Sequence, residues 1–436
     1  MHARKTRRAL IAGGAFAATI ALALAGCTPA APSGPVEISW LVISNDNEVG
    51  TSQALADAFT AANPDITINI ETRPAGGDGD NIIKTRLATG EMTDVFTYNS
   101  GSLFQALAPE KNLVPLTEAE TGNVVETFLP GVSVGDTVYG VPMGTAMGGG
   151  VLYNIPIYEE LGLSVPKTWD DFISNSEAIK AAGKTAIIQT YKDTWTSQLF
   201  VLGDFANVLA SEPSWADKYT ANEVKYATDD AARAGFEHLQ EAFDKGLLNA
   251  DFGSATLDDG LRMVATGEGA QYPMLTFAIG NIAGTYPDNV NDVGFFALPG
   301  ESAGENPLTT WLSDGVYIAA TTEGAKLEAA KKFLAYIASV ESCEVQTSAS
   351  VATGPYFVKG CTLPDDVPQG VKDLLPYFAT ATSAYPALEF LSPIKGPALE
   401  QITVAVGSGI TSAADGAAQY DVDVEKQAQQ LGLPGW

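Results

Sequence analysis

VEISWLVI, residues Val36–Ile43, is an apolar run followed by a polar turn, which predicts a buried strand. A helical pattern follows from about Thr51 to Ala62, and residues 66–70 then alternate isoleucine with polar residues, as a second strand does. A short helix over residues 82–87 leads to a third strand, DVFT (Asp94–Thr97). This order of strand, helix, strand, helix and strand predicts an α/β fold with a mostly parallel sheet flanked by helices.

The same alternation continues along the rest of the chain. Residues 168–179, 236–247 and 327–337 carry apolar side chains at helical spacing, and residues 186–188 and 293–297 read as further buried strands. A chain of 436 residues exceeds the size at which one hydrophobic core keeps growing. We therefore expect two α/β domains.

The charge balance excludes several classes of function. With 24 Lys and Arg against 52 Asp and Glu, the formal net charge is −28, so the cations that a nucleic-acid partner requires are missing. The two histidines are His2 and His238, too few for a zinc site of several imidazoles, and a hydrolase with an imidazole base has almost nothing to be built from. No metal and no cofactor are expected, whereas catalysis by carboxylates remains open.

The first 26 residues have the features of an export signal. Basic residues precede the uncharged run Ala9–Ala25, which is too short to span a bilayer comfortably and ends in small residues. The end of this run, LAGC (Leu24–Cys27), resembles the bacterial lipoprotein signal, in which the cysteine is acylated, with palmitate among the acyl chains, and becomes the first residue. Residues 27–35 would then tether the protein to the outer face of the bacterial cell membrane. An ordinary signal with a chance cysteine is the alternative, and the export route, general or twin-arginine, stays open.

Two cysteines remain in the exported part of the chain. Cys343 and Cys361 form an even pair, which in an oxidising compartment predicts a disulfide. Closing a loop of this size stabilises a protein by about 3 kcal/mol in the chain-entropy model. Two buried free thiols are the alternative.

Several segments, in order, resemble one protein family. They include YGVP (Tyr139–Pro142), VLYN (Val151–Asn154), LGL (Leu161–Leu163) and PKTWDDF (Pro166–Phe172). Together with shorter matches from about Val36 to Leu431, they are similar to the extracellular solute-binding proteins of ABC importers, and among these to the carbohydrate-binding group typified by maltose-binding protein. This resemblance implies a carbohydrate ligand, a partner permease in the membrane, a monomeric state and no enzymatic activity.

The resemblance also implies a fold of two lobes, each a mostly parallel sheet flanked by helices, with the ligand in the cleft between them. Three hinge crossovers would lie near Met143–Gly150, Asp292–Ala297 and Phe333–Val340. Residues 36–144 with 297–336 would then form the N-terminal lobe, and residues 150–292 with 340–430 the C-terminal lobe.

Candidate ligand-binding residues follow from the chemistry of a sugar, which offers hydroxyls around its rim and C–H groups on its ring face. Trp195 and Tyr98 fall where the family places stacking aromatic residues, and Phe277 stands where the family usually has tryptophan. The candidates are Asn45, Asp46, Tyr98, Asn99, Ser100, Trp195, Phe277, Trp311 and Asp314. An aromatic residue can instead belong to the core, and Asp46 and Asp314 can instead cap turns.

Three other residues are assigned structural positions. Trp40, inside a strand, and Trp169, at the start of a helix, are expected in the core, and His238 is expected at the surface of a helix.

Two rival functions remain open. A secreted glycosidase would also use aromatic residues and paired carboxylates. The same fold could instead carry a peptide, a polyamine or a metal chelate, because an excess of acid suits a cation.

Overall fold

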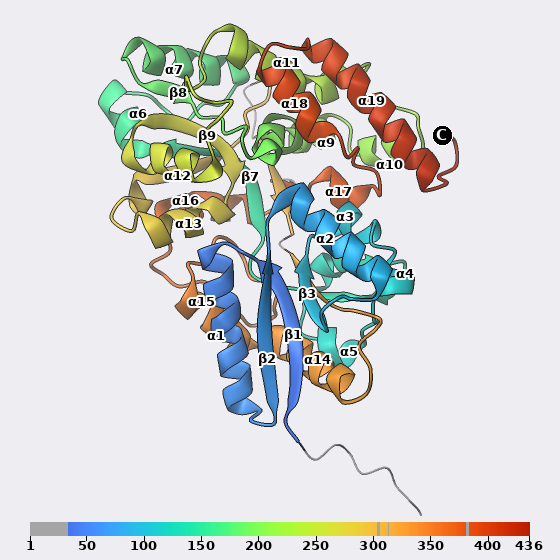
Figure 1. Ribbon diagram of the computed structural model, residues 1–436. Coiled ribbons are helices and arrows are strands. Elements are labelled where there is room, and N and C mark those ends of the chain that lie inside the picture. The colour runs from blue at the N-terminus through green and yellow to red at the C-terminus, as the bar shows by residue number, and fades with distance from the viewer. Residues whose placement is uncertain (1–33, 303–305, 313, 381–382) are drawn as a thin grey trace, which may run out of the picture. The chain divides into compact units, whose positions relative to one another are not determined.

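The computed structural model describes residues 34–302, 306–312, 314–380 and 383–436, with the backbone but not the side chain of Asp46. The expected signal over residues 1–26, Cys27 and the tether up to residue 33 lie outside these residues. Among the residues described, no helix has both the length and the apolar character needed to cross a membrane. Residues 35–436 form one compact unit built on two large sheets flanked by helices (Figure 1), which confirms the α/β class.

The first sheet has five strands in the order β2-β1-β3-β12-β6. β1 pairs in parallel with β2 and β3, whereas β12 runs antiparallel to β3 and β6. The strands are β1 (Val36–Ile43), β2 (Ile66–Arg73), β3 (Val95–Tyr98), β6 (Gly140–Pro142) and β12 (Gly315–Ile318). The flanking helices are α1 (Asp46–Ala62), α2 (Gly76–Thr89), α3 (Gly101–Gln105), α4 (Pro109–Asn112), α5 (Glu118–Thr121) and α14 (Gly324–Ile337).

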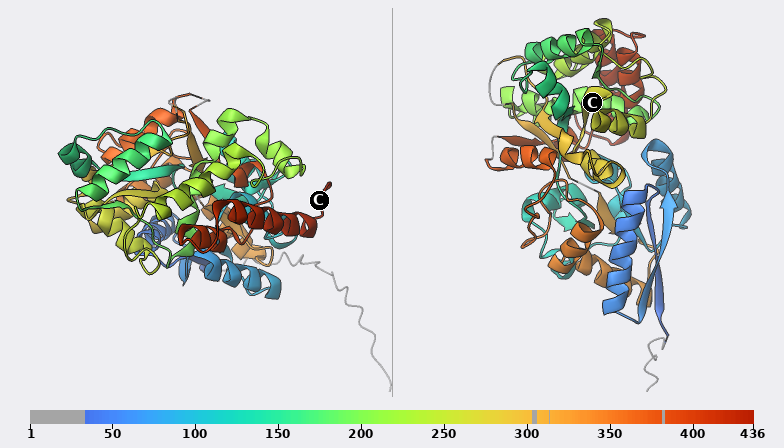
Figure 2. Two further views of the ribbon diagram at one scale, coloured as in Figure 1. Left: turned by 90° about the horizontal axis from the view of Figure 1, so that it is seen from above. Right: turned by 90° about the vertical axis from the view of Figure 1, so that its left-hand side faces the viewer.

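Alternation along β1 divides the helices between the two faces of this sheet. Trp40 packs against Phe333 of α14 with ring centroids 5.1 Å apart, and Phe59 of α1 meets the same ring at 5.1 Å. The next residue, Leu41, belongs to the apolar cluster on the other face together with Ile83 of α2. Successive residues of a strand point to opposite faces, so one strand anchors both helical layers. Trp40 is therefore a core residue, as expected. Figure 2 shows α1 lying along the blue strands of this sheet.

The second sheet is built around β7 (Met147–Asn154). Its order is β13-β11-β7-β9-β8, with β10 also paired to β7. β9, β10 and β11 run antiparallel to β7, while β8 and β13 join in parallel at the edges. The other strands are β8 (Thr185–Ile187), β9 (Gly269–Leu275), β10 (Val293–Ala297), β11 (Leu308–Trp311) and β13 (Ala384–Pro386).

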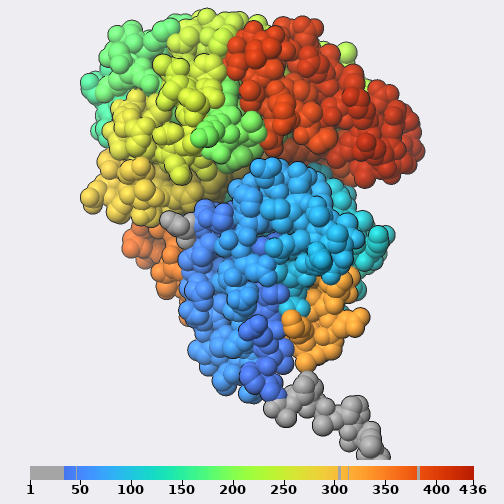
Figure 3. Space-filling model, viewed as in Figure 1, coloured from blue at the N-terminus to red at the C-terminus, as the bar shows by residue number. Residues whose placement is uncertain are grey.

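Many helices surround this second sheet, and the C-terminal ones form a continuous surface (red in Figure 3). They are α6 (Ile155–Leu161), α7 (Trp169–Ala181), α8 (Leu199–Gly203), α9 (Phe205–Ser211), α10 (Trp215–Thr220), α11 (Asp230–Asp244), α12 (Leu257–Thr266), α13 (Phe277–Thr285), α16 (Gln369–Leu374), α17 (Leu388–Leu391), α18 (Leu399–Gly407) and α19 (Ala413–Gln430).

Both sheets are mixed, which corrects the expectation of mostly parallel sheets. In the first sheet β12, which follows β11 of the second sheet in the chain, is antiparallel to β3. In the second sheet β7, which follows β6 of the first sheet, is antiparallel to β9. The expectation rested on the N-terminal βαβ series, and β1, β2 and β3 do pair in parallel.

The chain passes between the sheets at places that differ in part from the expected crossovers. The first passage, between β6 and β7, covers residues 143–146, within the expected range. The next lies between β11 and β12, because β11 pairs with β7 whereas β12 pairs with β3. Residues 292–297 instead contain β10, and α15 (Val340–Ala349) packs against α1. The exact division into lobes stays a prediction.

His238 is buried, contrary to the expectation of a surface position. Its side chain is 4% exposed on the inner face of α11, and its ring stacks on Trp169 with centroids 3.7 Å apart. His238 Nε2 lies 2.8 Å from the Glu301 carboxylate. The ring combines an apolar face with a polar edge, which allows it to join the core. Trp169 is a core residue, as expected.

Cys343 of α15 and Cys361 form the disulfide that the sequence predicts.

Candidate functional site

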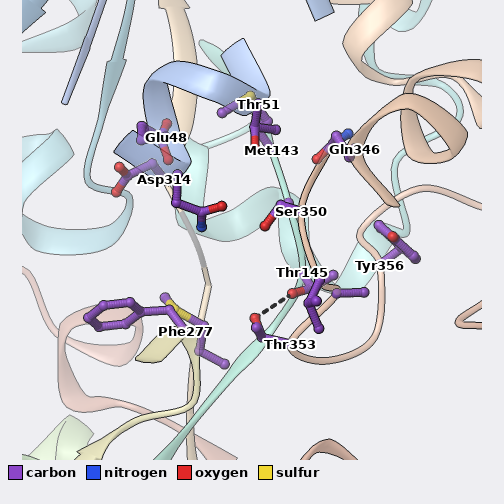
Figure 4. Close-up of a pocket in the computed structure, with 15 residues that line it drawn as sticks. Glu48, Thr51, Met143, Thr145, Phe277, Asp314, Gln346, Ser350, Thr353 and Tyr356 are labelled. Atoms are coloured by element: carbon purple, nitrogen blue, oxygen red, sulfur yellow. Dashed lines mark hydrogen bonds between the residues drawn. The ribbon is translucent and has the colours of Figure 1, made fainter. Parts of the chain in front are cut away.

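A cavity of about 140 Å³ lies where the chain passes between the two sheets (Figure 4). One water occupies about 10–15 Å³ on this scale, so the cavity has room for on the order of ten waters or a small polar ligand. Its walls come from the start of α1, the passages between the sheets, β7, α13, and α15 with the loop that follows it. The lining residues are Asn47, Glu48, Thr51, Met143, Gly144, Thr145, Met147, Phe277, Asp314, Gln346, Ser350, Val351, Ala352, Thr353 and Tyr356.

The N-terminus of α1 supplies one wall. Asn45 caps this helix by accepting a hydrogen bond from the backbone N–H of Glu48, with a distance of 2.8 Å. An Asn side chain at this position satisfies a backbone donor that the helix leaves free. The cap starts α1 at Asp46 rather than near Thr51, and its first two turns bring Glu48 and Thr51 to the cavity.

Two acidic residues, Glu48 and Asp314, line this cavity. Burial raises the pKa of Glu48 to about 7, and the nearby charge of Asp314 adds to the effect. Burial also raises the pKa of Asp314 to about 6. Glu48 Oε1 is buried and has no hydrogen-bond partner within the described part of the chain. A carboxyl group in this state can exchange hydrogen bonds with the hydroxyls of a ligand.

Arg73 lies behind these acids at the end of β2. It is 2% exposed, and its guanidinium donates to the carbonyl oxygens of Pro74 at 3.1 Å and Thr97 at 3.2 Å. Its positive charge opposes the rise in the pKa of both Glu48 and Asp314. The buried arginine therefore offsets part of the cost of holding two acids at one wall.

Helix α13, which follows β9 of the second sheet, contributes an aromatic side chain, that of Phe277. Thr276 anchors it through two hydrogen bonds to Gly148 of β7, one from Thr276 N to the carbonyl oxygen at 2.9 Å and one from Gly148 N to Thr276 Oγ1 at 3.0 Å. The ring of Phe277 packs against Trp195, with centroids 6.0 Å apart. An apolar ring is thus held in the same cavity as the two carboxyl groups, at the start of α13.

Two backbone segments that pass between the sheets are tied together at this cavity. Met143 N donates to the carbonyl oxygen of Asp314 at 3.0 Å. Thr145 Oγ1 and Thr353 Oγ1 lie 3.1 Å apart, which links the first passage to the loop after α15 (Figure 4). The cavity therefore lies beside the segments of chain that connect the two sheets.

Of the candidates named from sequence, Phe277 and Asp314 line the cavity, whereas the other described side chains lie elsewhere. Asn45 is the exposed cap of α1, and the side chain of Asp46 lies outside the described residues. Half-buried Trp195 stands behind Phe277.

The remaining candidates gather at the ends of β3 and β11. Tyr98 is fully buried in the core of the first sheet, the carbonyl oxygen of Asn99 accepts a hydrogen bond from Tyr317, and Ser100 is the buried residue before α3. Trp311 is 6% exposed, and a Cβ on Gly149 would overlap its ring. Whether any of these candidates touches a ligand stays a prediction.

Sequence reasoning missed Glu48 and Arg73. Both carry a readable signal, since Glu48 follows an Asn helix cap after the first strand, and Arg73 ends an alternating strand just before Pro74. The side chains from Gln346 to Tyr356 carry no such signal, because the fold alone brings them to the cavity.

Comparison with known proteins places this architecture in one family. The family model for bacterial extracellular solute-binding proteins matches residues 45–342. The multiple sugar-binding protein of Streptococcus mutans is 27% identical over 317 residues, which cover 71% of this chain and 72% of that protein. The melibiose/raffinose/stachyose-binding protein MelE of Bacillus subtilis is 25% identical over 347 residues, which cover 77% and 78%.

Solved structures share the fold over nearly the whole chain. A chitin oligosaccharide binding protein has a TM-score of 0.77 at 21% identity and covers 91% of this chain and 99% of its own. RafE in complex with raffinose has a TM-score of 0.76 at 20% identity, with 90% and 100% covered. The resemblance noted in the sequence is thereby confirmed, and the chain belongs to the bacterial extracellular solute-binding proteins.

Proposed function

We propose that the protein is the carbohydrate-binding component of an ABC importer. It captures a mono- or oligosaccharide in the cavity lined by Glu48, Asp314 and Phe277 and delivers the sugar to a membrane permease. The observation that carries the proposal is this cavity, where two half-buried acids and an aromatic residue lie together in a member of the solute-binding family. The sugar-binding relatives support a neutral, hydroxyl-rich ligand.

The chemistry of the walls suits a sugar. Glu48 and Asp314 accept hydrogen bonds from hydroxyls, and Phe277 offers a flat face to the C–H groups of a ring. Leaving a buried polar group without a hydrogen-bond partner costs about 1–3 kcal/mol. A ligand that donates a hydrogen bond to the free oxygen of Glu48 therefore binds more tightly than a ligand that does not.

The position of the cavity suits capture by closure. A ligand that touches Glu48 on one side and Phe277 on the other binds best when both walls are close. Moving a two-state protein from mostly open to mostly closed takes about 5.5 kcal/mol of differential affinity. The closed form would be the one that the permease recognises.

The location of the protein is inferred from its family and from its N-terminal sequence. As a member of an extracellular family, the protein works outside the cytoplasm. We infer that residues 1–26 are removed on export and that a lipid on Cys27 anchors the protein to the outer face of the cell membrane as a monomer.

Calorimetric titration with raffinose, stachyose, melibiose and glucose tests this function, with each mixture analysed for products. Saturable heat with unchanged sugar is the expected result. Hydrolysis products would identify a glycosidase instead, and heat only with spermidine or a peptide would identify a different cargo.

A further inference from the structure

We propose that the Cys343–Cys361 disulfide positions one wall of the ligand cavity, so that its reduction weakens ligand binding while the two sheets stay folded. This inference rests on the proposed function. It assigns the disulfide a role in binding rather than in global stability alone.

The first observation is where the lining residues fall in the chain. Six of the residues that line the cavity lie inside the loop that the disulfide closes. They are Gln346, Ser350, Val351, Ala352, Thr353 and Tyr356. The cystine thus encloses the whole stretch of chain that supplies this wall of the cavity.

The second observation is that the two ends of this loop attach to different neighbours. At its start, α15 packs against α1. At its end, the carbonyl oxygen of Pro355 accepts a hydrogen bond from Ala146 N, and that of Phe357 accepts one from Val125 N, both at 2.8 Å. The disulfide is the covalent link between these two attachments, and it fixes their spacing.

The middle of the loop approaches the first passage between the sheets very closely. A Cβ on Gly354 would overlap the carbonyl oxygen of Ala146. The neighbouring Thr353 lies 3.1 Å from Thr145, Oγ1 to Oγ1. A small shift of this loop would therefore change the wall of the cavity. It would also change the contact of the loop with residues 143–146, the first passage between the sheets.

The third observation is the small size of the apolar cluster around the bond. Cys343 packs with Ala352, Tyr356 and Val358, and with the partly buried Cys361 and Leu363. Apart from Leu363, which also packs against a cluster of the second sheet, these residues belong to none of the larger clusters that pack against the two sheets. Cutting the bond therefore loosens the wall, while the packing of the two sheets is left in place.

The test compares the oxidised protein with protein reduced by the phosphine TCEP. Reduction converts the disulfide to two thiols, while the phosphine takes up oxygen from water and becomes the phosphine oxide. Affinity for raffinose, stachyose and melibiose is measured by calorimetry on both forms, and alkylation with mass analysis counts the thiols. In parallel, hydrogen exchange follows residues 350–357 and the strands β1 and β3.

Reduction should weaken the affinity by about tenfold or more and speed exchange in residues 350–357, with β1 and β3 unchanged. The Cys343→Ser and Cys361→Ser double variant should match the reduced protein and show no further response to TCEP, which also controls for Cys27. Equal affinity before and after verified reduction would overturn the inference, as would unfolding of the whole protein on reduction. If the oxidised protein binds none of these sugars, the proposed function fails, and exchange in residues 350–357 still decides whether the bond orders the wall.

Discussion

Replacing Glu48 with glutamine should stabilise the ligand-free protein in a way that depends on pH. Burial raises the pKa of the Glu48 carboxyl in the folded protein to about 7, above its ordinary value of 4.5. Below about pH 4.5 the carboxyl is protonated in both the folded and the unfolded state and costs nothing. As the pH rises toward 7, the unfolded chain ionises more readily than the folded one, so stability is progressively lost. Glutamine has no such titration.

The size of the effect follows from the shift. A rise from 4.5 to about 7 corresponds to roughly 3 kcal/mol at about 1.4 kcal/mol per pKa unit. The Glu48→Gln variant should therefore exceed the wild type in free energy of unfolding by on the order of 3 kcal/mol at pH 8. At pH 4 the two proteins should agree. Urea unfolding followed by tryptophan fluorescence at pH 4, 6 and 8 measures this difference.

Asp57→Asn is the matched control, because it also turns a carboxyl into an amide on α1 but at an exposed position. It should show no comparable dependence on pH. The same Glu48→Gln variant should bind sugar more weakly at pH 8 by about 1 kcal/mol or more, since hydrogen bonds to charged groups are the stronger ones. A difference between variant and wild type that is the same at pH 4 and pH 8 would refute the reasoning about Glu48.

Three further predictions follow from the positions of single side chains. Phe277→Ala should weaken sugar binding by about 1 kcal/mol or more in calorimetry with little change in melting temperature, because its ring is half-buried at the cavity, and undiminished affinity would remove it from the site. Trp311→Ala should instead lower the free energy of unfolding by about 3–5 kcal/mol in urea, since the ring fills the core beside Gly149, and a purely binding-related loss would contradict this placement. Cys27→Ala should release the protein from the membrane fraction of expressing cells, as judged by immunoblotting, whereas unchanged membrane association would exclude lipid attachment at this residue.

The parts of the fold that the sequence predicts are those with strong local signals. β1 is a continuous apolar run, and α7 begins where Thr168 accepts a hydrogen bond from Asp171 N at 3.0 Å. Such signals are contained within a few residues, so they can be read without the structure.

Features that depend on distant pairing were not predictable in the same way. β11 is four residues long, and nothing in its sequence says that it joins β7 rather than β3. The close approach of the Trp311 ring to Gly149, which lies far away in the sequence, could not be foreseen either, and the predicted role of Trp311 in ligand binding stays a prediction.

The candidate site shows the same limit. Phe277 was identified because it stands where the family usually has tryptophan, and Asp314 because it shares a loop with Trp311; both line the cavity. Glu48 was missed because the helix was expected to begin near Thr51, whereas the Asn45 cap starts it at Asp46. Arg73, at the end of β2, opposes the rise in the pKa of both Glu48 and Asp314, which lie far from it in the sequence or on another element. Only the folded structure reveals this proximity.

A crystal structure of the protein grown with the sugar that gives the strongest calorimetric signal is the most direct measurement. An intact sugar should occupy the cavity, with hydroxyls within hydrogen-bond distance of Glu48 and Asp314 and a ring face against Phe277. A sugar bound elsewhere, or one found cleaved in the cavity, would contradict the account.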